Sequence, residues 1–229
     1  MKHLFFLLSA FILLSCGGTK EDENGSTEEK AENPAQKPSL PYIGLHDVDY
    51  IMKDGERVPD TIYHTVPPYV LLAHDSSEFS NLNVEGKIHV ANFFFTSCPA
   101  ICPAMIEQMK RLQAATEDIE ELTFLSHTID PIRDTIPRLQ NYIAERNLDT
   151  HNWFFLYGDK ETVYTLGEDG YMINAMEDEY AEGGFLHSEH FVLVDRSGHI
   201  RGLYTGTDPV EVDQLEKDIR FLLKEEYGN

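Results

Sequence analysis

An apolar run at residues 88–95 leads directly into Cys98 and Cys102, which stand four positions apart. Such a run is typical of a strand that is buried on both faces of a sheet. From Met105 onward the apolar residues recur at helical spacing. The chain therefore predicts a central strand that passes through two thiols into a helix. Open α/β sheets usually place their chemistry at this point.

Two thiols at the start of a helix can exchange with disulfides or can hold a metal ion that prefers sulfur. The helix N-terminus is expected to lower at least one thiol pKa, which favours the thiolate and serves both uses. Positions i and i+4 share a helix face, so both sulfurs can reach one metal ion. A structural disulfide is a poorer explanation, because so small a loop stabilises a fold less than a long loop does. Spacing alone leaves redox chemistry and metal binding open.

Residues 1–15 have the features of an export signal, with a positive charge at Lys2 and a short apolar core at 4–14. That core is too short to span a membrane as a mature helix. Residues 13–16, Leu-Leu-Ser-Cys, resemble the bacterial lipobox, which implies that Cys16 is lipidated and becomes the mature N-terminus. We therefore expect a periplasm-facing lipoprotein of the cell envelope that is anchored to a bacterial membrane. Disulfides persist in that compartment.

Residues 16–39 are rich in glycine, proline and charged side chains and are expected to form a disordered acidic tether. The folded domain is expected to occupy residues 40–229. The formal net charge of the chain is −22. A surface this acidic repels phosphate, so nucleic-acid binding is excluded as a function class.

The folded part is predicted to be a mixed α/β domain with a β extension at its N-terminus. That extension turns at Asp54-Gly55 and includes a strand at 69–73. After the strand at 88–95 we expect a helix at 103–116, a strand at 122–126, a helix at 135–146, a strand at 153–157, a short helix at 160–167, strands at 190–195 and 199–204, and a helix from 208 to 227. The order predicts a parallel core that ends in an antiparallel hairpin, with helices flanking a mixed central sheet. This arrangement resembles a thioredoxin fold.

A third ligand would favour metal binding over redox chemistry. His187 and His190 stand just before the strand at 190–195. Residues three apart in an extended chain point to opposite faces, so these two are not expected to reach the dithiol together.

Three further side chains near the predicted site have two interpretations each. Asp130 follows the strand at 122–126 and is either a carboxylate that orients a ligand or the first residue of an Asp-Pro turn. His127 is either a neighbour of the site or a loop residue. The thioether of Met105 is a possible ligand, but its helical spacing with two later apolar residues favours core packing.

Residues 93–103, Phe-Phe-Phe-Thr-Ser-Cys-Pro-Ala-Ile-Cys-Pro, are very similar to the signature of the Sco/SenC family of copper-binding assembly proteins. Residues 130–135 contain Asp-Pro and Asp-Thr, as does the corresponding segment of that family. The resemblance extends over roughly residues 60–225. It implies a thioredoxin-like fold for that stretch.

The family's histidine lies eleven residues before the glycine of the last hairpin turn. Counting back from Gly198 selects His187 rather than His190. The aspartate that usually precedes this histidine is replaced here by Leu186.

The resemblance implies a copper site made of Cys98, Cys102 and His187. Two thiolates suit Cu(I), and an added imidazole allows Cu(II) as well, although zinc accepts the same ligands. Both cysteines must be reduced to bind the ion, so their redox state would control loading.

A metallochaperone for the dinuclear copper centre of cytochrome c oxidase is the first function that the resemblance implies. Its partner would be the subunit that carries the centre, with other copper chaperones or thiol–disulfide reductases as further partners. The alternatives are a thiol–disulfide reductase, in which Cys98 attacks and Cys102 resolves the mixed disulfide, and a redox or copper sensor.

Overall fold

The computed structural model describes residues 39–99, 101–177 and 185–228. The predicted export signal, the predicted lipidation site Cys16 and residues 16–38 of the predicted tether lie outside the described residues. Within the described ranges, no helix combines the length and the apolar character that crossing a membrane requires.

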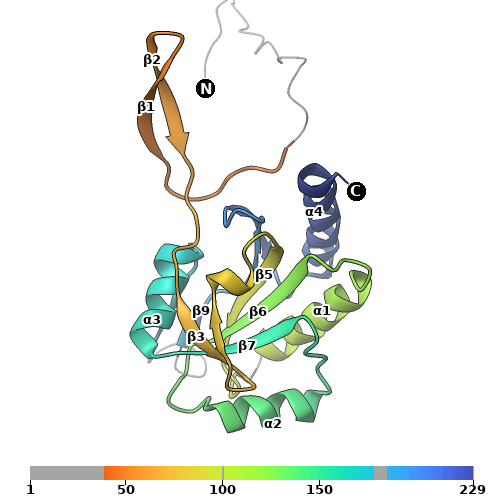
Figure 1. Ribbon diagram of the computed structural model, residues 1–229. Helices are drawn as coiled ribbons and strands as arrows, with labels where there is room; N and C mark the ends of the chain where they lie inside the picture. The colour runs from red at the N-terminus through yellow and green to blue at the C-terminus, as the bar shows by residue number, and fades with distance from the viewer. Residues whose placement is uncertain (1–38, 100, 178–184, 229) are drawn as a thin grey trace, which may run out of the picture. The chain divides into compact units, whose positions relative to one another are not determined.

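The N-terminal β extension begins with a separate two-stranded hairpin (Figure 1). It is formed by β1, Asp47–Lys53, and β2, Glu56–Ile62. Asp54 and Gly55 connect the strands with φ angles of 53° and 86°. Two consecutive residues with positive φ match the turn that the twist of a hairpin favours. The predicted turn at Asp54-Gly55 is therefore confirmed.

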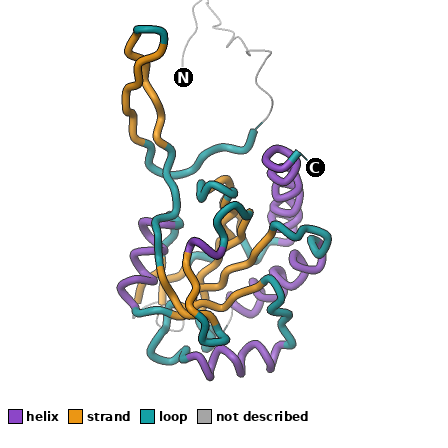
Figure 2. Tube along the Cα trace, viewed as in Figure 1, coloured by secondary structure: helices purple, strands orange, loops and turns teal. Residues whose placement is uncertain are grey.

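The core of the described part is a mixed sheet with the strand order β11-β10-β5-β6-β7-β3-β4. Figure 2 shows its strands in orange, with helices in purple around them. Strands β5, β6 and β7 are parallel, and the strands at both edges are antiparallel to their neighbours. The bounds are β3 Val70–Ala73, β4 Glu78–Ser80, β5 Ile88–Phe94, β6 Leu122–Thr128, β7 Trp153–Tyr157, β10 His190–Val194 and β11 Ile200–Thr205. The predicted mixed α/β architecture is confirmed.

Helices cover both faces of this sheet. Tyr142 packs on Phe94, whereas Tyr171 packs on Phe93. Neighbouring strand residues point to opposite faces, so the segments that carry these tyrosines cover opposite sides of β5. The helical segments are η1 Asn81–Asn83, α1 Ile101–Ala115, α2 Ile136–Arg146, α3 Lys160–Thr165, the π turn η2 Leu166–Gly170, and α4 Pro209–Tyr227.

The sequence pattern predicts the central elements well. Every residue of β5 and β6 is buried, as expected for strands covered on both faces. Met105, Met109 and Leu112 form the buried side of α1, which confirms core packing for Met105. The carboxylate of Asp208 accepts a hydrogen bond from the backbone N–H of Val210 and caps α4 as predicted.

A second small hairpin was not predicted. Strands β8, Ala175–Glu177, and β9, Phe185–His187, pair antiparallel outside the central sheet. Strands this short carry too few residues to show alternation in the sequence. The hairpin matters because β9 leads directly into β10.

Candidate metal centre

The two thiols lie where β5 passes into α1. The backbone N–H of Cys102, in the first turn of the helix, donates a hydrogen bond to Sγ of Cys98 over 3.3 Å. The side chain of Cys98 is half-buried, whereas Cys102 is buried. No disulfide joins them. The centre therefore has one sulfur that a partner can approach and one that the fold covers.

The pKa of Cys102 shifts upward from its ordinary value. The hydrogen bond between the two thiols is the larger cause, and burial is the second. The expected lowering by the helix N-terminus is thus outweighed at this cysteine. The raised pKa favours the protonated thiol of Cys102. Sγ of Cys98 accepts a hydrogen bond from the backbone N–H of Cys102.

A buried carboxylate fixes the strand end just before the dithiol. Asp134 accepts hydrogen bonds from the backbone N–H of Thr96 over 2.9 Å, from the hydroxyl of Thr96, and from the hydroxyl of Thr128 over 2.6 Å. No ion pair of Asp134 occurs among the described residues. Arg138 donates a hydrogen bond to the hydroxyl of Thr96 over 3.1 Å and pairs with Glu145 over 3.7 Å. Burial raises the pKa of Asp134 above its ordinary value.

This role of Asp134 was missed, because Asp-Thr before a helix is typical of a cap. In the structure the N-cap of α2 is Thr135, and its side chain makes no capping hydrogen bond. The signal in the sequence was the pair of threonines, Thr96 and Thr128, at the carboxyl ends of two neighbouring parallel strands. Such ends meet at one edge of a sheet.

Asp130 has a local partner in the structure. Its carboxylate accepts hydrogen bonds from the backbone N–H of Arg133 over 3.3 Å and from the guanidinium of Arg133 over 3.0 Å. These contacts close a turn after β6. A role of Asp130 in orienting a metal ligand stays a prediction.

His127 is not a loop residue. Strand β6 extends two residues beyond the predicted end, so His127 lies inside the core and stacks on Phe93 with ring centroids 4.8 Å apart. Burial lowers the pKa of His127 to about 4. The imidazole is therefore neutral near pH 7.

Tyr142 of α2 was not singled out by the sequence, although it lies on the inward face of that helix. Its side chain is buried, and its hydroxyl has no hydrogen-bond partner within the described residues. Burial raises the pKa of Tyr142, and the charges of Cys102 and Cys98 act on the same hydroxyl. Tyr142 thus keeps its proton next to the dithiol.

The backbone brings His187 toward the same end of β5. Strand β10 runs antiparallel to β5 with Val192 opposite Ala91, so the start of β10 lies at the carboxyl end of β5, where the dithiol follows. His187 ends β9, three residues before β10 begins at His190. The side chain of His187 lies outside the described part of the chain.

His190 has a partner of its own. Its Nδ1 lies 2.6 Å from the hydroxyl of Ser188. Within the described residues, no three histidine, cysteine or acidic side chains are grouped as metal ligands. The described part of the predicted centre is therefore its two sulfurs.

Comparisons with known proteins match this chain to one family and one fold. The model of the SCO1/SenC family matches residues 59–224. A protein of Stutzerimonas stutzeri, named as a candidate copper-binding protein, is 28% identical over 70% of this chain and 78% of its own length.

Two solved structures have the same fold. A SCO1/SenC family lipoprotein from Bacillus anthracis is 27% identical, with a TM-score of 0.63 over 69% of this chain and 95% of that chain. BsSco is described as a member of the Sco family of cytochrome c oxidase assembly proteins with a disulfide switch. It is 26% identical, with a TM-score of 0.61 over 69% of this chain and 92% of that chain.

Proposed function

Since the chain belongs to the SCO1/SenC family, we propose that it carries copper on Cys98, Cys102 and His187 and delivers it to the copper-bearing subunit of a cytochrome c oxidase. Relatives named for copper binding and for oxidase assembly support this proposal. The observation that carries it is the pair of reduced thiols at the start of α1, with Cys98 half-buried and Cys102 buried.

The chemistry of the site fits a copper ion as cargo. Two thiolates suit Cu(I), and an imidazole from His187 would also allow Cu(II). Asp134 adds a buried carboxylate that forms no ion pair among the described residues. Burial raises its pKa, and a cation bound nearby would favour its charged form. A low-dielectric site with surplus negative charge favours a bound cation.

Release follows from the difference between the two sulfurs. An incoming thiolate of the target can replace Cys98 first, because Cys98 is the more accessible. Cys102 takes up a proton when it leaves the ion, since its pKa is raised. That proton uptake makes the return of copper to Cys102 less favourable.

Copper titration of the reduced protein tests the proposal. Residues 39–229 form a compact unit and are expected to bind one copper ion per chain. Cys98→Ser, Cys102→Ser and His187→Ala are each expected to weaken binding strongly, and His190→Ala is the matched control. Unchanged copper affinity in Cys98→Ser would show that the site is wrong, and equal losses in the two histidine variants would refute the choice of His187.

A thiol–disulfide reductase is the second candidate, and the asymmetry of the two thiols favours it. Cys98 as thiolate would attack a target disulfide, form a mixed disulfide and release one target thiolate. Cys102, after losing its proton, would attack Sγ of Cys98, so that the target is reduced by two electrons and the protein ends as the Cys98–Cys102 disulfide. A His187→Ala protein that loses copper but still supports oxidase assembly would establish this function instead.

We also propose that the chain is a lipoprotein of the cell envelope, lipidated at Cys16 and facing the periplasm. The bacterial relative described as a lipoprotein supports this. Cys16→Ser is expected to move the protein from the membrane fraction to the soluble fraction. A variant that stays with the membrane would contradict lipidation at this residue.

A further inference from the structure

A cavity lies at the opposite end of β5 from the dithiol. Its volume is about 450 Å³, which is within the range of small-molecule sites. His89, the second residue of β5, lines this cavity, whereas Cys98 and Cys102 follow the end of the strand. The cavity is therefore separate from the proposed copper centre.

Three segments that lie far apart in the sequence meet around His89 and form the walls of the cavity. They are residues 66–69, residues 81–86 and the turn at residues 195–198. The backbone N–H of Val66 donates a hydrogen bond to the carbonyl of Gly198 over 2.9 Å. The backbone N–H of Gly86 donates a hydrogen bond to the carbonyl of Arg196 over 3.2 Å. These bonds hold the walls together, so the cavity is part of the fold.

The ring of His89 has a polar atom without a partner in the fold. Its side chain is only 3% exposed. Nε2 lies 3.4 Å from the hydroxyl of Tyr171, whereas Nδ1 has no hydrogen-bond partner among the described residues. A buried polar atom without a partner costs stability, and native folds usually pair such atoms with protein, water or a ligand. We expect the group that pairs with Nδ1 to come from the cavity that His89 lines.

The floor of the cavity, formed by the buried side chains of His89 and Tyr69, is uncharged. Burial lowers the pKa of His89 to about 3, so the imidazole is neutral near pH 7. Burial raises the pKa of Tyr69, so its hydroxyl keeps its proton. A neutral imidazole has one nitrogen that donates and one that accepts. A hydroxyl group on a ligand can serve either nitrogen, because it both donates and accepts.

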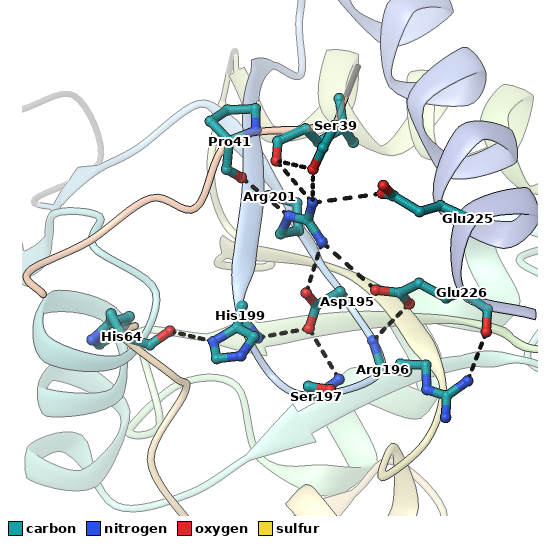
Figure 3. A network of polar contacts seen from close by, with 11 residues as sticks. Ser39, Pro41, His64, Asp195, Arg196, Ser197, His199, Arg201, Glu225 and Glu226 are labelled. Carbon is teal, nitrogen blue, oxygen red and sulfur yellow. Dashed lines mark hydrogen bonds and ion pairs between the residues drawn. The ribbon is translucent and has the colours of Figure 1, made fainter. Parts of the chain in front are cut away.

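Two of the charged side chains that line the walls have partners elsewhere. Both carboxylate oxygens of Asp195 accept hydrogen bonds from groups of the hairpin β10–β11 (Figure 3). The guanidinium of Arg196 donates to the carbonyl of Glu226 over 2.9 Å. Glu85 is exposed and forms no ion pair among the described residues. An anion would meet Glu85 and a chain of net charge −22, and a cation would lose water against an uncharged floor.

Apolar side chains complete the walls. They are Val66, Leu82 and Val84. Val84 is buried, whereas Leu82 is 70% exposed and lies at the mouth of the cavity. Burial of apolar surface against these side chains would stabilise a ligand with an apolar body.

We propose that this cavity binds a small uncharged molecule with an apolar body and a hydroxyl group, of the chemical class of the phenols. The hydroxyl of the ligand pairs with Nδ1 of His89, and the apolar body lies between Tyr69 and the apolar walls. This inference goes beyond the proposed function and does not depend on it, because the cavity shares no residue with the dithiol.

Phenol and toluene are matched probes, since they have the same number of non-hydrogen atoms and differ in the hydroxyl. Each is titrated into residues 39–229, the compact unit, and the backbone N–H groups are followed by NMR. Phenol is expected to saturate, with shifts at residues 66, 86, 89 and 198. Toluene is expected to bind at least about fivefold more weakly, because it leaves Nδ1 without a partner. No saturation by phenol, or equal affinity for both probes, would overturn the proposal, and the cavity would then hold only water.

His89→Phe tests the pairing of the hydroxyl with Nδ1. The variant keeps a ring and removes the polar atom, so phenol is expected to lose at least about fivefold in affinity while toluene binds at least as well as before. The preference between the probes is thus expected to reverse. A loss of affinity that is equal for phenol and toluene would contradict the pairing, since a purely structural role weakens both alike.

Leu82→Trp tests the position of the ligand without changing the core. The larger side chain at the mouth is expected to weaken phenol binding at least tenfold. Val210→Trp is the matched control, because Val210 is 74% exposed and does not line the cavity. It is expected to bind phenol within twofold of the unmodified protein. Unchanged phenol binding in Leu82→Trp, or equal losses in both variants, would place the phenol elsewhere and overturn the proposal.

Discussion

Asp134 and Asp195 are buried carboxylates at opposite ends of the central strand β5, and their surroundings differ. Asp195 pairs with the buried guanidinium of Arg201 over 3.0 Å and accepts hydrogen bonds from the N–H groups of Ser197 and His199. Within the described residues, the hydrogen bonds to the Asp134 carboxylate come from one backbone N–H and two hydroxyls, all three uncharged.

The difference indicates separate tasks for the two ends. At the other end, the buried guanidinium of Arg201 pairs with Asp195 and also lies 3.6 Å from Glu226 and 3.8 Å from Glu225 (Figure 3). Removing Arg201 therefore leaves Asp195 buried without a cation. Asp134 has no ion pair among the described residues, and its charge acts on Cys102, one of two thiols that can bind a cation. One end holds the structure together, and the other is prepared for a ligand.

Arg201→Met is expected to give the largest effect on stability. It leaves Asp195 buried without its cation and is expected to lower the free energy of unfolding by about 3–5 kcal/mol. Urea unfolding of residues 39–229 measures this. Copper stoichiometry of the folded variant is expected to stay unchanged. A loss below about 1 kcal/mol would show that the network is not structural.

Acid is expected to weaken the fold through two histidines that belong to neither network. Burial lowers the pKa of His89 to about 3 and that of His127 to about 4. Below pH 6.5 the two histidines bind protons in the unfolded chain but stay neutral in the folded chain. The free energy of unfolding is therefore highest above pH 6.5 and decreases as the pH falls below it. From pH 7.5 to 5.5 the two residues together are expected to cost about 3 kcal/mol.

Urea unfolding at several pH values measures the acid effect. His127→Gln is expected to remove about half of the pH dependence, since one of the two groups remains. The exposed His151 offers a control, and His151→Gln is expected to leave the dependence unchanged. A slope that His127→Gln does not alter would contradict the assignment.

Asp134→Asn tests the ligand end of the comparison. Removing the uncompensated charge is expected to lower copper affinity by about tenfold, the lower end of the range for residues that orient metal ligands. Asp195→Asn is the matched control, expected to lower stability while copper affinity stays within twofold. If both variants lose copper equally, the two ends do not differ in the way proposed.

The parts of the fold that the sequence predicts well are those with local signals. The buried strands β5 and β6 are apolar along their length, and α4 has Asp208 before it and Gly228 after it. The dithiol was found from its position alone. The contacts made by distant segments were not found. The helix at 135–146 was predicted to be capped by Asp134 or Thr135, which left the buried hydrogen bonds of Asp134 unpredicted, and Tyr142 was not singled out. Contacts across the fold decided both: hydrogen bonds from Thr96 and Thr128 hold Asp134, and packing on Phe94 buries Tyr142. Single-sequence patterns do not contain such contacts.

Asp130→Asn is expected to have the smallest effect. It tests whether Asp130, in the Asp-Pro pair, has a different role from Asp134, in the Asp-Thr pair. The guanidinium of Arg133 that pairs with Asp130 has a side chain that is 63% exposed. Asp130 itself is 4% exposed, but its partner guanidinium reaches water, so screening limits the contribution of the pair to about 1 kcal/mol. Copper affinity is expected to stay within about threefold of the unmodified protein, a smaller change than removal of a residue that orients a metal ligand usually gives. Arg133→Ala should change stability by a similar small amount. Asp130→Asn could instead lose as much copper affinity as Asp134→Asn while its stability stays unchanged. That result would place Asp130 at the copper site, and both carboxylates would then favour the bound cation.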